Sequence, residues 1–224
     1  MKRTILVPQR AYKFMEPQFL KKAMLEKVIF INFLGDYSTD KYGNAIGDDD
    51  EGKLNTEIQL NSHTLGFEDN SALDHYLHNN IVSMEGSETE VQFNNVKING
   101  CNIDNNYYSY CVAMKYSERV KQKFGGATLE INNFPRFIEE VYKELAKLEI
   151  RFVEAKPCEY IMNRKKIYTE NNFEYQIPSL IKDKEKYEYQ QEFRVLWKPK
   201  NGLKITKPIN LYCPKALEYC TFHF

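Results

Sequence analysis

The sequence lacks the features that mark most secreted, membrane-spanning and zinc-binding chains. Its five cysteines are an odd number and include no Cys-x-x-Cys pair, so neither a zinc site nor a disulfide framework is predicted. No apolar run approaches the roughly 20 residues that cross a bilayer. The run Ile5-Leu6-Val7 before Pro8 is too short for the core of a signal peptide. We therefore expect a soluble, cytoplasmic protein with free thiols.

The sequence also lacks a net charge and the glycine motifs of nucleotide sites. It has 31 basic and 31 acidic residues, so no overall positive field favours nucleic acid, although a local basic groove is not excluded. Neither G-x-G-x-x-G nor G-x-x-x-x-G-K-[ST] occurs, which leaves a Rossmann or P-loop site without support. Aromatic residues are plentiful instead, with 16 Tyr and 14 Phe. These residues fit a sheet face better than a half-polar cleft.

Many short apolar segments with strand character alternate irregularly with a few helical segments. Strands are expected at residues 12–15, 28–33, 57–65, 90–99, 107–114, 127–131, 151–154, 159–162 and 190–197, with a last hairpin partner at 204–212. Helices are expected at residues 17–27, 117–124, 135–149 and 178–186. Because this order shows no regular βαβ alternation, it predicts an α+β fold with largely antiparallel sheets and three or four helices. We expect one domain over residues 1–224.

Three polar segments are candidates for metal or phosphate binding. Residues 34–53 are rich in Gly and Asp and predict a long loop, of the kind that often forms a lid or binding loop. Its acidic run 48–51 does not match the EF-hand spacing, so a solvated loop tip is favoured over a cation site. His75 and His78 share a helical face without a third ligand, which favours a solvated helix. The basic run 164–166 is interpreted as a solvated turn. No metal site is predicted.

The segment Gln190-Gln191-Glu192-Phe193-Arg194 carries the strongest chemical pattern. In a strand, side chains two residues apart share a face, so Gln190, Glu192 and Arg194 would lie on one side and Phe193 on the other. A carboxylate with an amide two residues before it can stabilise a developing cation and orient a nucleophile. The alternative is that Glu192 and Arg194 form an ordinary charge pair on a wet sheet face.

Three segments together resemble a large, poorly characterised family of bacterial and phage proteins. They are Arg-Ala-Tyr-Lys-Phe at residues 10–14, Gly-Asp-Asp-Asp-Glu-Gly at 47–52 and Gln-Gln-Glu-Phe-Arg at 190–194. Members of that family begin with a Tyr-Arg/Lys-Phe/Tyr strand, carry a Gly-Asp-x-x-Glu-Gly-like loop and end with a Glu-Phe/Tyr-Arg strand. The family is often found in defence-related settings, and its fold resembles that of ADP-ribosyltransferases.

The resemblance implies an enzyme that transfers ADP-ribose from NAD to a protein or nucleic-acid acceptor, in phage–host conflict or as a toxin. Glu192 would be the catalytic carboxylate, and Gln190 would orient the acceptor. Arg10 or Tyr12 would be the early contact with NAD. Arg194 would bind a phosphate or lower the pKa of Glu192.

The chain departs from the ADP-ribosyltransferase pattern in its middle motif. Residues 111–114 read Cys-Val-Ala-Met where a Ser-Thr-Ser cluster is expected, and Ser109 and Ser117 are displaced alternatives. Asp48 and Glu51 match the family's loop and are expected near its cleft. The missing cluster and the abundant tyrosines support an alternative function, a non-catalytic module that binds a partner protein in phage or bacterial defence. A nucleic-acid enzyme is a third reading.

Overall fold

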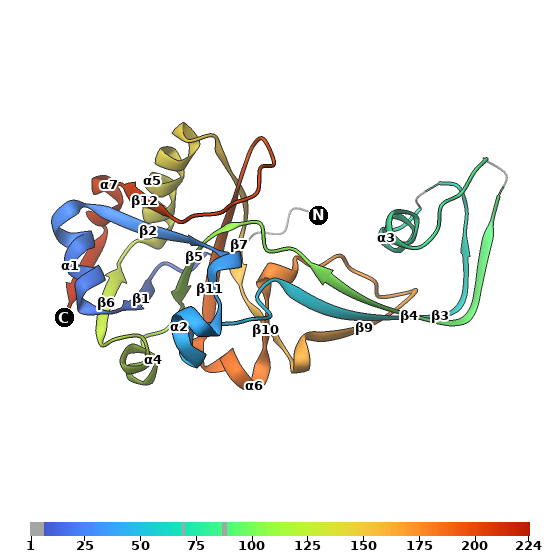
Figure 1. Cartoon of the computed structure of the whole chain (residues 1–224), viewed down its shortest axis with the longest axis horizontal. Helices are drawn as coiled ribbons and strands as arrows, with labels where there is room; N and C mark the ends of the chain where they lie inside the picture. Colours follow the sequence, from blue (N-terminus) through green and yellow to red (C-terminus); the bar gives the residue numbers. More distant parts are fainter. Residues whose placement is uncertain (1–6, 69, 87–88) are drawn as a thin grey trace.

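A computed structural model describes residues 7–68, 70–86 and 89–224 of the chain. It shows a main body, built on an eight-stranded sheet, and an arm, built on a three-stranded sheet that projects from the body (Figure 1). Ile5 and Leu6 of the N-terminal apolar run lie outside the described residues. None of the described helices combines the length and the apolar composition that a membrane span requires.

All strand pairs of the main sheet are antiparallel. One path runs β12-β2-β5-β1-β6-β13, while β11 pairs with the other edge of β5 and with β7. The strands are β1 (Ala11–Met15), β2 (Val28–Phe33), β5 (Tyr108–Ala113), β6 (Ala127–Ile131), β7 (Ile150–Pro157), β11 (Glu192–Pro199), β12 (Ile209–Tyr212) and β13 (Cys220–His223). This order places β11 in the interior of the sheet.

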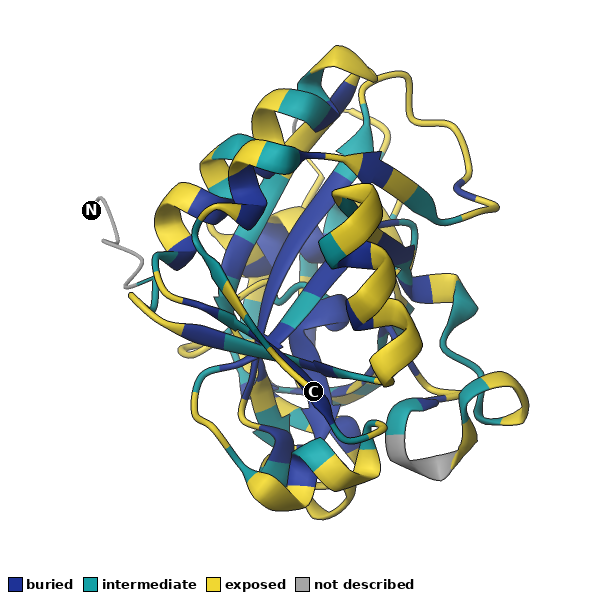
Figure 2. Ribbon diagram, turned by 90° about the vertical axis from the view of Figure 1, so that its left-hand side faces the viewer, coloured by how far each residue is buried: buried dark blue, intermediate teal, exposed yellow. Residues whose placement is uncertain are grey.

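Helices cover the two faces of the main sheet unequally. The helices α1 (Pro17–Glu26), α5 (Phe134–Lys147) and α7 (Pro214–Leu217) pack on one face, where they enclose the largest apolar core. In α5 the apolar residues Phe137, Val141 and Leu145 recur every fourth position, so one stripe of the helix is fully buried. The shorter α4 (Glu118–Lys123) packs over the other face. Figure 2 shows the buried strands between helices whose outer surfaces are exposed.

The arm has a core of its own. Its sheet has the order β4-β3-β9, in which β3 (Lys53–Leu65) is antiparallel to β4 (Val91–Ile103) and parallel to β9 (Lys165–Thr169). Alternating apolar side chains of β3 pack against α3 (Ala72–Asn80), where Leu73 and Leu77 are buried. This apolar cluster is separate from the core of the body.

A third, two-stranded unit lies near the junction of body and arm. Its strands, β8 (Glu159–Ile161) and β10 (Ile181–Asp183), pair in parallel. The short elements η2 (Met162–Arg164), η3 (Pro178–Leu180) and α6 (Lys184–Tyr187) come directly before or after these strands in the chain, and η4 (Glu188–Gln190) follows α6. The remaining helical elements are η1 (Leu34–Asp36) and α2 (Thr39–Ile46).

The predicted class is confirmed, since the fold is mixed α+β with mostly antiparallel sheets. The described residues form seven α-helices, of which four have eight or more residues, against the three or four expected. The helix predicted at 178–186 is wrong, because this stretch forms η3, β10 and α6 in succession. The loop predicted at 34–53 also contains α2, where the Thr39 N–H and hydroxyl both donate to the Asp49 carboxylate.

The predicted strand beginning at Gln190 is wrong as well. Gln190 ends η4, and Gln191 has a left-handed backbone with φ of 43°, which breaks the strand geometry. The strand begins only at Glu192. Glu192 and Arg194 share a face as predicted, with Phe193 and Val195 in the opposite core.

Candidate functional site

Six charged side chains meet in the interior where the arm joins the body. Each exposes at most 6 % of its surface, and three are acidic and three basic, so their formal charges cancel. They come from the loop after α2, from η2, from β10 and from β11. We call this group the ionic network, and its members are Asp48, Glu51, Arg164, Lys182, Glu192 and Arg194.

Arg194 is the centre of the ionic network. Its Nε donates to Glu192 Oε1 at 2.5 Å, and its Nη1 and Nη2 donate to the two oxygens of Glu51 at 2.5 and 2.8 Å. Nη1 also donates to the carbonyl of Ser179 at 2.6 Å. Burial alone would lower the pKa of Arg194, but the charges of Glu192 and Glu51 raise it well above its usual range. The guanidinium therefore carries a fixed charge that two carboxylates share.

Lys182 donates hydrogen bonds to both Gln190 and Glu192, the two residues that the sequence pattern suggests for catalysis. Its Nζ donates to Gln190 Oε1 at 3.2 Å and to Glu192 Oε2 at 3.0 Å, and it lies 4.5 Å from the centre of the Tyr187 ring. Burial lowers the pKa of Lys182, but the charge of Glu192 more than offsets this, so the pKa is raised. Gln190 and Glu192 thus converge on one ammonium group although they do not share a strand.

Glu192 is held in its ionised form. Burial would raise the pKa of its carboxyl, but the positive charges of Arg194 and Lys182 lower the pKa far below its usual value. Its backbone N–H donates to the hydroxyl of Tyr160 at 2.7 Å, and burial raises the pKa of that phenol. Glu192 is therefore suited to stabilise a positive charge and not to act as a general acid.

The fourth ion pair of the network, between Arg164 and Asp48, joins η2 to the loop after α2. Arg164 donates to the carboxylate of Asp48 and to the carbonyl of Asp50. Burial and the nearby charge of Glu51 raise the pKa of Asp48. The solvated loop tip and the solvated turn expected from the sequence are wrong for Asp48, Glu51 and Arg164, which are buried, whereas their neighbours Asp49, Asp50 and Lys165 are exposed as expected. Asn163 and Arg164 both have left-handed backbones (φ 51° and 47°), which form a tight turn at this position.

Gly52 lets the acidic loop, residues 47–52, lie close to the chain that follows β4. Its φ is +75°, and a Cβ at this position would lie 2.8 Å from the carbonyl oxygen of Asp104. Only glycine combines this backbone with this contact. The loop is fastened further by the hydroxyl of Tyr187, which donates to the carbonyl of Gly47 at 3.0 Å. These contacts fix the segment that supplies Asp48 and Glu51.

Strand β5 places Ser109 on the same face as Glu192. Directly opposed residues of neighbouring strands share a face, and β11 pairs Glu192 with Ala113, Arg194 with Cys111 and Leu196 with Ser109. The Ser109 hydroxyl lies 3.0 Å from the Cys111 sulfur, and burial raises the pKa of that thiol. Of the two alternatives for the middle motif, Ser109 is the one that faces the network. Ser117 caps α4, where its hydroxyl accepts the Val120 N–H.

Both residues expected to contact NAD early, Arg10 and Tyr12, lie beside Glu130 of β6. Arg10 has a side chain that is 64 % exposed, and its nearest charged partner is Glu130 on β6, at 3.7 Å. It is not brought to Glu192. Tyr12 opposes Ala113 of β5, which itself opposes Glu192, so Tyr12 lies on the face of the site but with one strand in between. The proposed roles of Arg10 and Tyr12 in NAD binding stay predictions.

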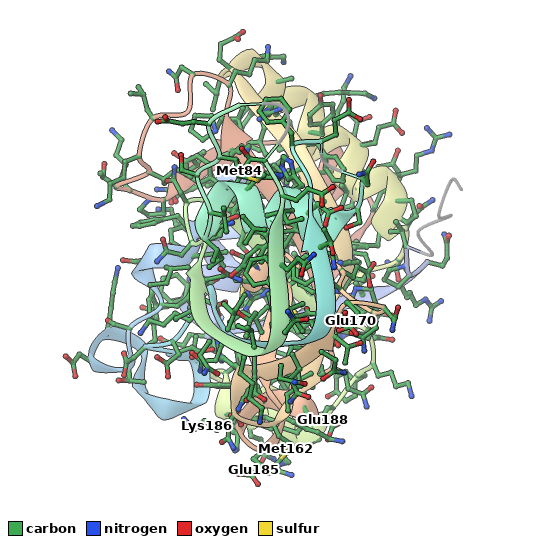
Figure 3. All side chains as sticks on the ribbon, turned by 90° about the vertical axis from the view of Figure 1, so that its right-hand side faces the viewer. Met84, Met162, Glu170, Glu185, Lys186 and Glu188 are labelled. Atoms are coloured by element: carbon green, nitrogen blue, oxygen red, sulfur yellow. The ribbon has the colours of Figure 1, made fainter. Side chains whose placement is uncertain are left out.

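Of two cavities, the first borders the ionic network, and none of the six residues of the network lines the second. The first, of about 220 Å³, is lined by polar residues of the acidic loop, η2 and α6, including Asp48, Arg164 and Tyr187. Figure 3 shows Lys186 of α6, another lining residue, near Met162 below the arm. The second, of about 480 Å³, includes Glu154 and other charged residues of β7, β8 and β9. Glu192 lines neither cavity.

The described residues give no sign of a metal centre. Within residues 7–68, 70–86 and 89–224, no group of three or more His, Cys, Asp or Glu side chains is arranged to hold a metal ion. All five cysteines are free thiols. His75 and His78 lie on α3 as expected.

No family model, curated protein or solved structure matches this chain. Function must therefore be inferred from the site itself. Sequence reasoning found Glu192, Arg194 and Gln190 but missed Lys182, which fell in a mispredicted helix, and Arg164, which was set aside as a surface charge. The Gly-Asp-x-x-Glu-Gly-like pattern was the one signal that pointed to Asp48 and Glu51.

Proposed function

We propose that this chain is an ADP-ribosyltransferase-like enzyme that transfers ADP-ribose from NAD to a protein or nucleic-acid acceptor, in the setting of phage–host conflict. The observation that carries the proposal is the convergence of Gln190 and the ionised Glu192 on Lys182, inside a buried network of charges. Buried groups with strongly perturbed pKa values are typical of functional sites.

The charge of Glu192 fits the chemistry of this reaction. As the bond between ribose and nicotinamide breaks, nicotinamide leaves with the bonding electron pair and positive charge develops on the ribose. A carboxylate held ionised beside the ribose stabilises that charge. The acceptor then bonds to the same carbon and releases its proton. Arg194 keeps Glu192 charged and in place, and its four donated hydrogen bonds favour this positioning role over phosphate binding.

The proposal requires a movement of β8 and β10. Tyr160 of β8 and Lys182 of β10 both contact Glu192, which lines neither cavity. NAD must displace this cover to reach the carboxylate. We therefore expect NAD to change amide hydrogen exchange in residues 159–161 and 181–183, measured by mass spectrometry.

The decisive experiment compares label transfer from NAD by three proteins. The protein, Glu192→Gln and Glu149→Gln are incubated with labelled NAD and a panel of protein and nucleic-acid acceptors. Glu149 has a side chain that is 72 % exposed, so its variant serves as the matched control. We expect Glu192→Gln to lower transfer by about 100-fold or more and Glu149→Gln to leave it unchanged. Equal transfer by Glu192→Gln, or no transfer by the unmodified protein to any acceptor, would contradict the proposal.

A second candidate function is a non-catalytic module that binds a partner protein. The specific observation in its favour is that the ionic network is internally matched, with both oxygens of Glu192 already bonded to Arg194 and Lys182. Affinity capture from host lysate distinguishes the two functions. A stoichiometric partner that the Glu192→Ala variant retains, without NAD turnover, supports the binding module.

A further inference from the structure

The surface around α4 carries an excess of positive charge, although the chain as a whole is neutral. Residues 115–123 include four basic side chains and one acidic one. The basic residues are Lys115, Arg119, Lys121 and Lys123, of which all but Lys121 are exposed. None of the four forms an ion pair with the part of the chain that the structure describes. The acidic residue, Glu118, accepts a hydrogen bond from the hydroxyl of Tyr116 at 2.6 Å. The four cations are therefore available to an anionic partner.

Two of these cations share one aromatic ring. Arg119 Cζ lies 4.8 Å and Lys123 Nζ lies 4.5 Å from the centre of the Tyr189 ring. The two residues are four positions apart on α4, so their like charges lie side by side and repel each other. A phosphate group between them would remove this repulsion and accept hydrogen bonds from both. The pair therefore favours a phosphate-bearing partner.

Tyrosine rings lie beside the cations. Tyr116 exposes 49 % of its surface, and its ring packs edge-on against Tyr12 and Phe14 of β1, with centres 5.7 and 5.8 Å apart. Tyr189 is half-buried over the apolar cluster that contains Phe14. Partly exposed rings beside cations are typical of proteins that bind single-stranded nucleic acid, since bases stack on the rings while the cations hold phosphates. In a duplex the base faces are already stacked on one another, so the rings would have nothing to bind.

These cations and rings border the candidate site. We call them the α4 surface, and its members are Lys115, Tyr116, Arg119, Lys121, Lys123 and Tyr189. Tyr189 lies three residues before Glu192 in the chain. The carbonyl of Gln191 accepts the N–H of Met114 at 3.0 Å, and Met114 directly follows β5 on the way to α4. Figure 1 shows α4 and α6 below the main sheet. A strand held on the α4 surface is thus close to the segment that leads into Glu192.

We propose that the α4 surface binds single-stranded nucleic acid and presents one of its bases as the acceptor of ADP-ribose, the second part of which rests on the proposed function. A base that projects from a single strand can reach a buried carboxylate, whereas a base in a duplex must first leave the stack. In the transfer, the bond between ribose and nicotinamide breaks and its electron pair leaves with nicotinamide. A base nitrogen bonds to the same ribose carbon and releases its proton to water.

The first test measures binding without NAD. Fluorescein-labelled single-stranded DNA of mixed sequence, RNA of the same sequence and the DNA duplex are titrated with the protein, and fluorescence anisotropy is recorded over a salt series. We expect at least one single strand to bind saturably and about fivefold or more tighter than the duplex. Arg119→Gln with Lys123→Gln should weaken this binding about tenfold or more. Because two phosphate contacts are lost, the slope of log K against log salt should shrink by about 1.4.

A matched control separates the α4 surface from the total charge. Lys204→Gln with Lys207→Gln removes two exposed lysines from the segment between β11 and β12. This double variant has the same net charge as Arg119→Gln with Lys123→Gln and should bind the single strand normally.

A single tyrosine tests the stacking of bases. Tyr116→Ala should weaken binding of the single strand about fivefold or more and leave binding of the duplex unchanged. Tyr142, on α5, has a similar exposure of 41 %, so Tyr142→Ala is its control and should bind both probes normally. Circular dichroism confirms that every variant folds.

Four binding results would overturn the proposal. They are the absence of saturable binding to either single strand at low salt, equal affinity for the duplex, displacement of the strand by polyglutamate as readily as by unlabelled strand, and binding that Arg119→Gln with Lys123→Gln does not weaken. Equal displacement by polyglutamate would assign the surface to an acidic protein instead.

The transfer assay then separates this inference from the proposed function. ADP-ribose transfer to a protein acceptor, by a chain that binds neither single strand, would overturn the inference and leave the proposed function standing. Binding of the strand without ADP-ribose transfer to any acceptor would refute the acceptor role together with the proposed function, while the binding surface itself would be confirmed.

Discussion

Arg194 and Lys182 keep two carboxylates, those of Glu51 and Glu192, charged in the interior of this protein. Removing charges from water is costly, and a buried ion pair is often no more stabilising than apolar residues of the same volume. The ionic network is therefore hard to explain as a device for stability alone. Its position beside a cavity and its perturbed pKa values favour a functional role.

The ionisation of Glu192 predicts how stability depends on pH. The folded-state pKa of Glu192 is lowered from 4.5, so its contribution to stability is fully present above that pH and is lost as the pH falls toward the folded-state pKa. The free energy of unfolding, measured by urea denaturation, should fall for both proteins between about pH 5 and pH 3. The fall should be about 1–2 kcal/mol smaller for Glu192→Gln than for the unmodified protein. Glu51, whose pKa is also lowered, leaves part of the dependence in both proteins.

Asp48 acts in the opposite direction, because burial and Glu51 raise its pKa, but it is present in both proteins and cancels in the comparison. Glu149→Gln, which removes an exposed carboxylate, should reproduce the curve of the unmodified protein. Parallel curves for the unmodified protein and Glu192→Gln would show that Glu192 is not held in its charged form.

At the scale of single residues, sequence patterns found the partners that are close in the chain. The two-residue spacing correctly placed Glu192 and Arg194 on one face. It did not find the Arg164–Asp48 pair, whose members are 116 positions apart. The sequence around Arg164 does not distinguish it from a surface residue. Its burial depends on the distant loop that contains Asp48 and Asp50.

Among the elements, a regular hydrophobic period was a reliable guide. Helix α5 was expected from its apolar stripe and from Asn133, whose side chain accepts the Arg136 N–H at its start. The stretch from 178 to 191 was not predicted, since it changes structure every three or four residues. Its form is set by tertiary contacts such as those of Lys182 and Tyr187.

The loop that carries Asp48 and Glu51 should be sensitive to a single methyl group. Gly52→Ala adds a Cβ that would lie 2.8 Å from the Asp104 carbonyl oxygen, in a left-handed backbone. We expect a loss of about 2–4 kcal/mol in the free energy of unfolding, from backbone strain and the clash together. Chemical denaturation followed by circular dichroism measures it.

Gly202→Ala separates the two causes. Gly202 also has a left-handed backbone, with φ of +71°, but a Cβ there would meet nothing within 4 Å. This control should lose about 1 kcal/mol. Equal losses in the two variants would mean that the approach of Gly52 to Asp104 is unimportant.

For the molecule as a whole, the composition and the irregular order of elements predicted the fold class. They did not predict an arm with its own apolar cluster. The reason is that alternating apolar and polar residues are expected both when all strands belong to a single sheet and when they are divided between two sheets. Separate clusters imply that arm and body can open separately.

Leu77→Ala tests this independence. Leu77 is fully buried in the arm cluster, and its truncation should cost about 2–5 kcal/mol of local stability. We expect faster amide hydrogen exchange in β3, β4 and α3, with β5 and β11 unchanged. The matched change Leu145→Ala, at a fully buried position of the body, should show the reverse distribution. Acceleration spread evenly over both parts by either variant would mean that they open as one unit.

The single tryptophan of the chain lies in the body, and this gives the molecule a built-in optical reporter. Trp197 is fully buried in the core beneath α5, and its indole N–H has no hydrogen-bond partner within the described part of the chain. Its fluorescence should be blue-shifted in the native protein and should move to longer wavelength when the body melts. Unfolding of the arm alone would leave the emission wavelength unchanged. The indole therefore monitors unfolding of the body selectively.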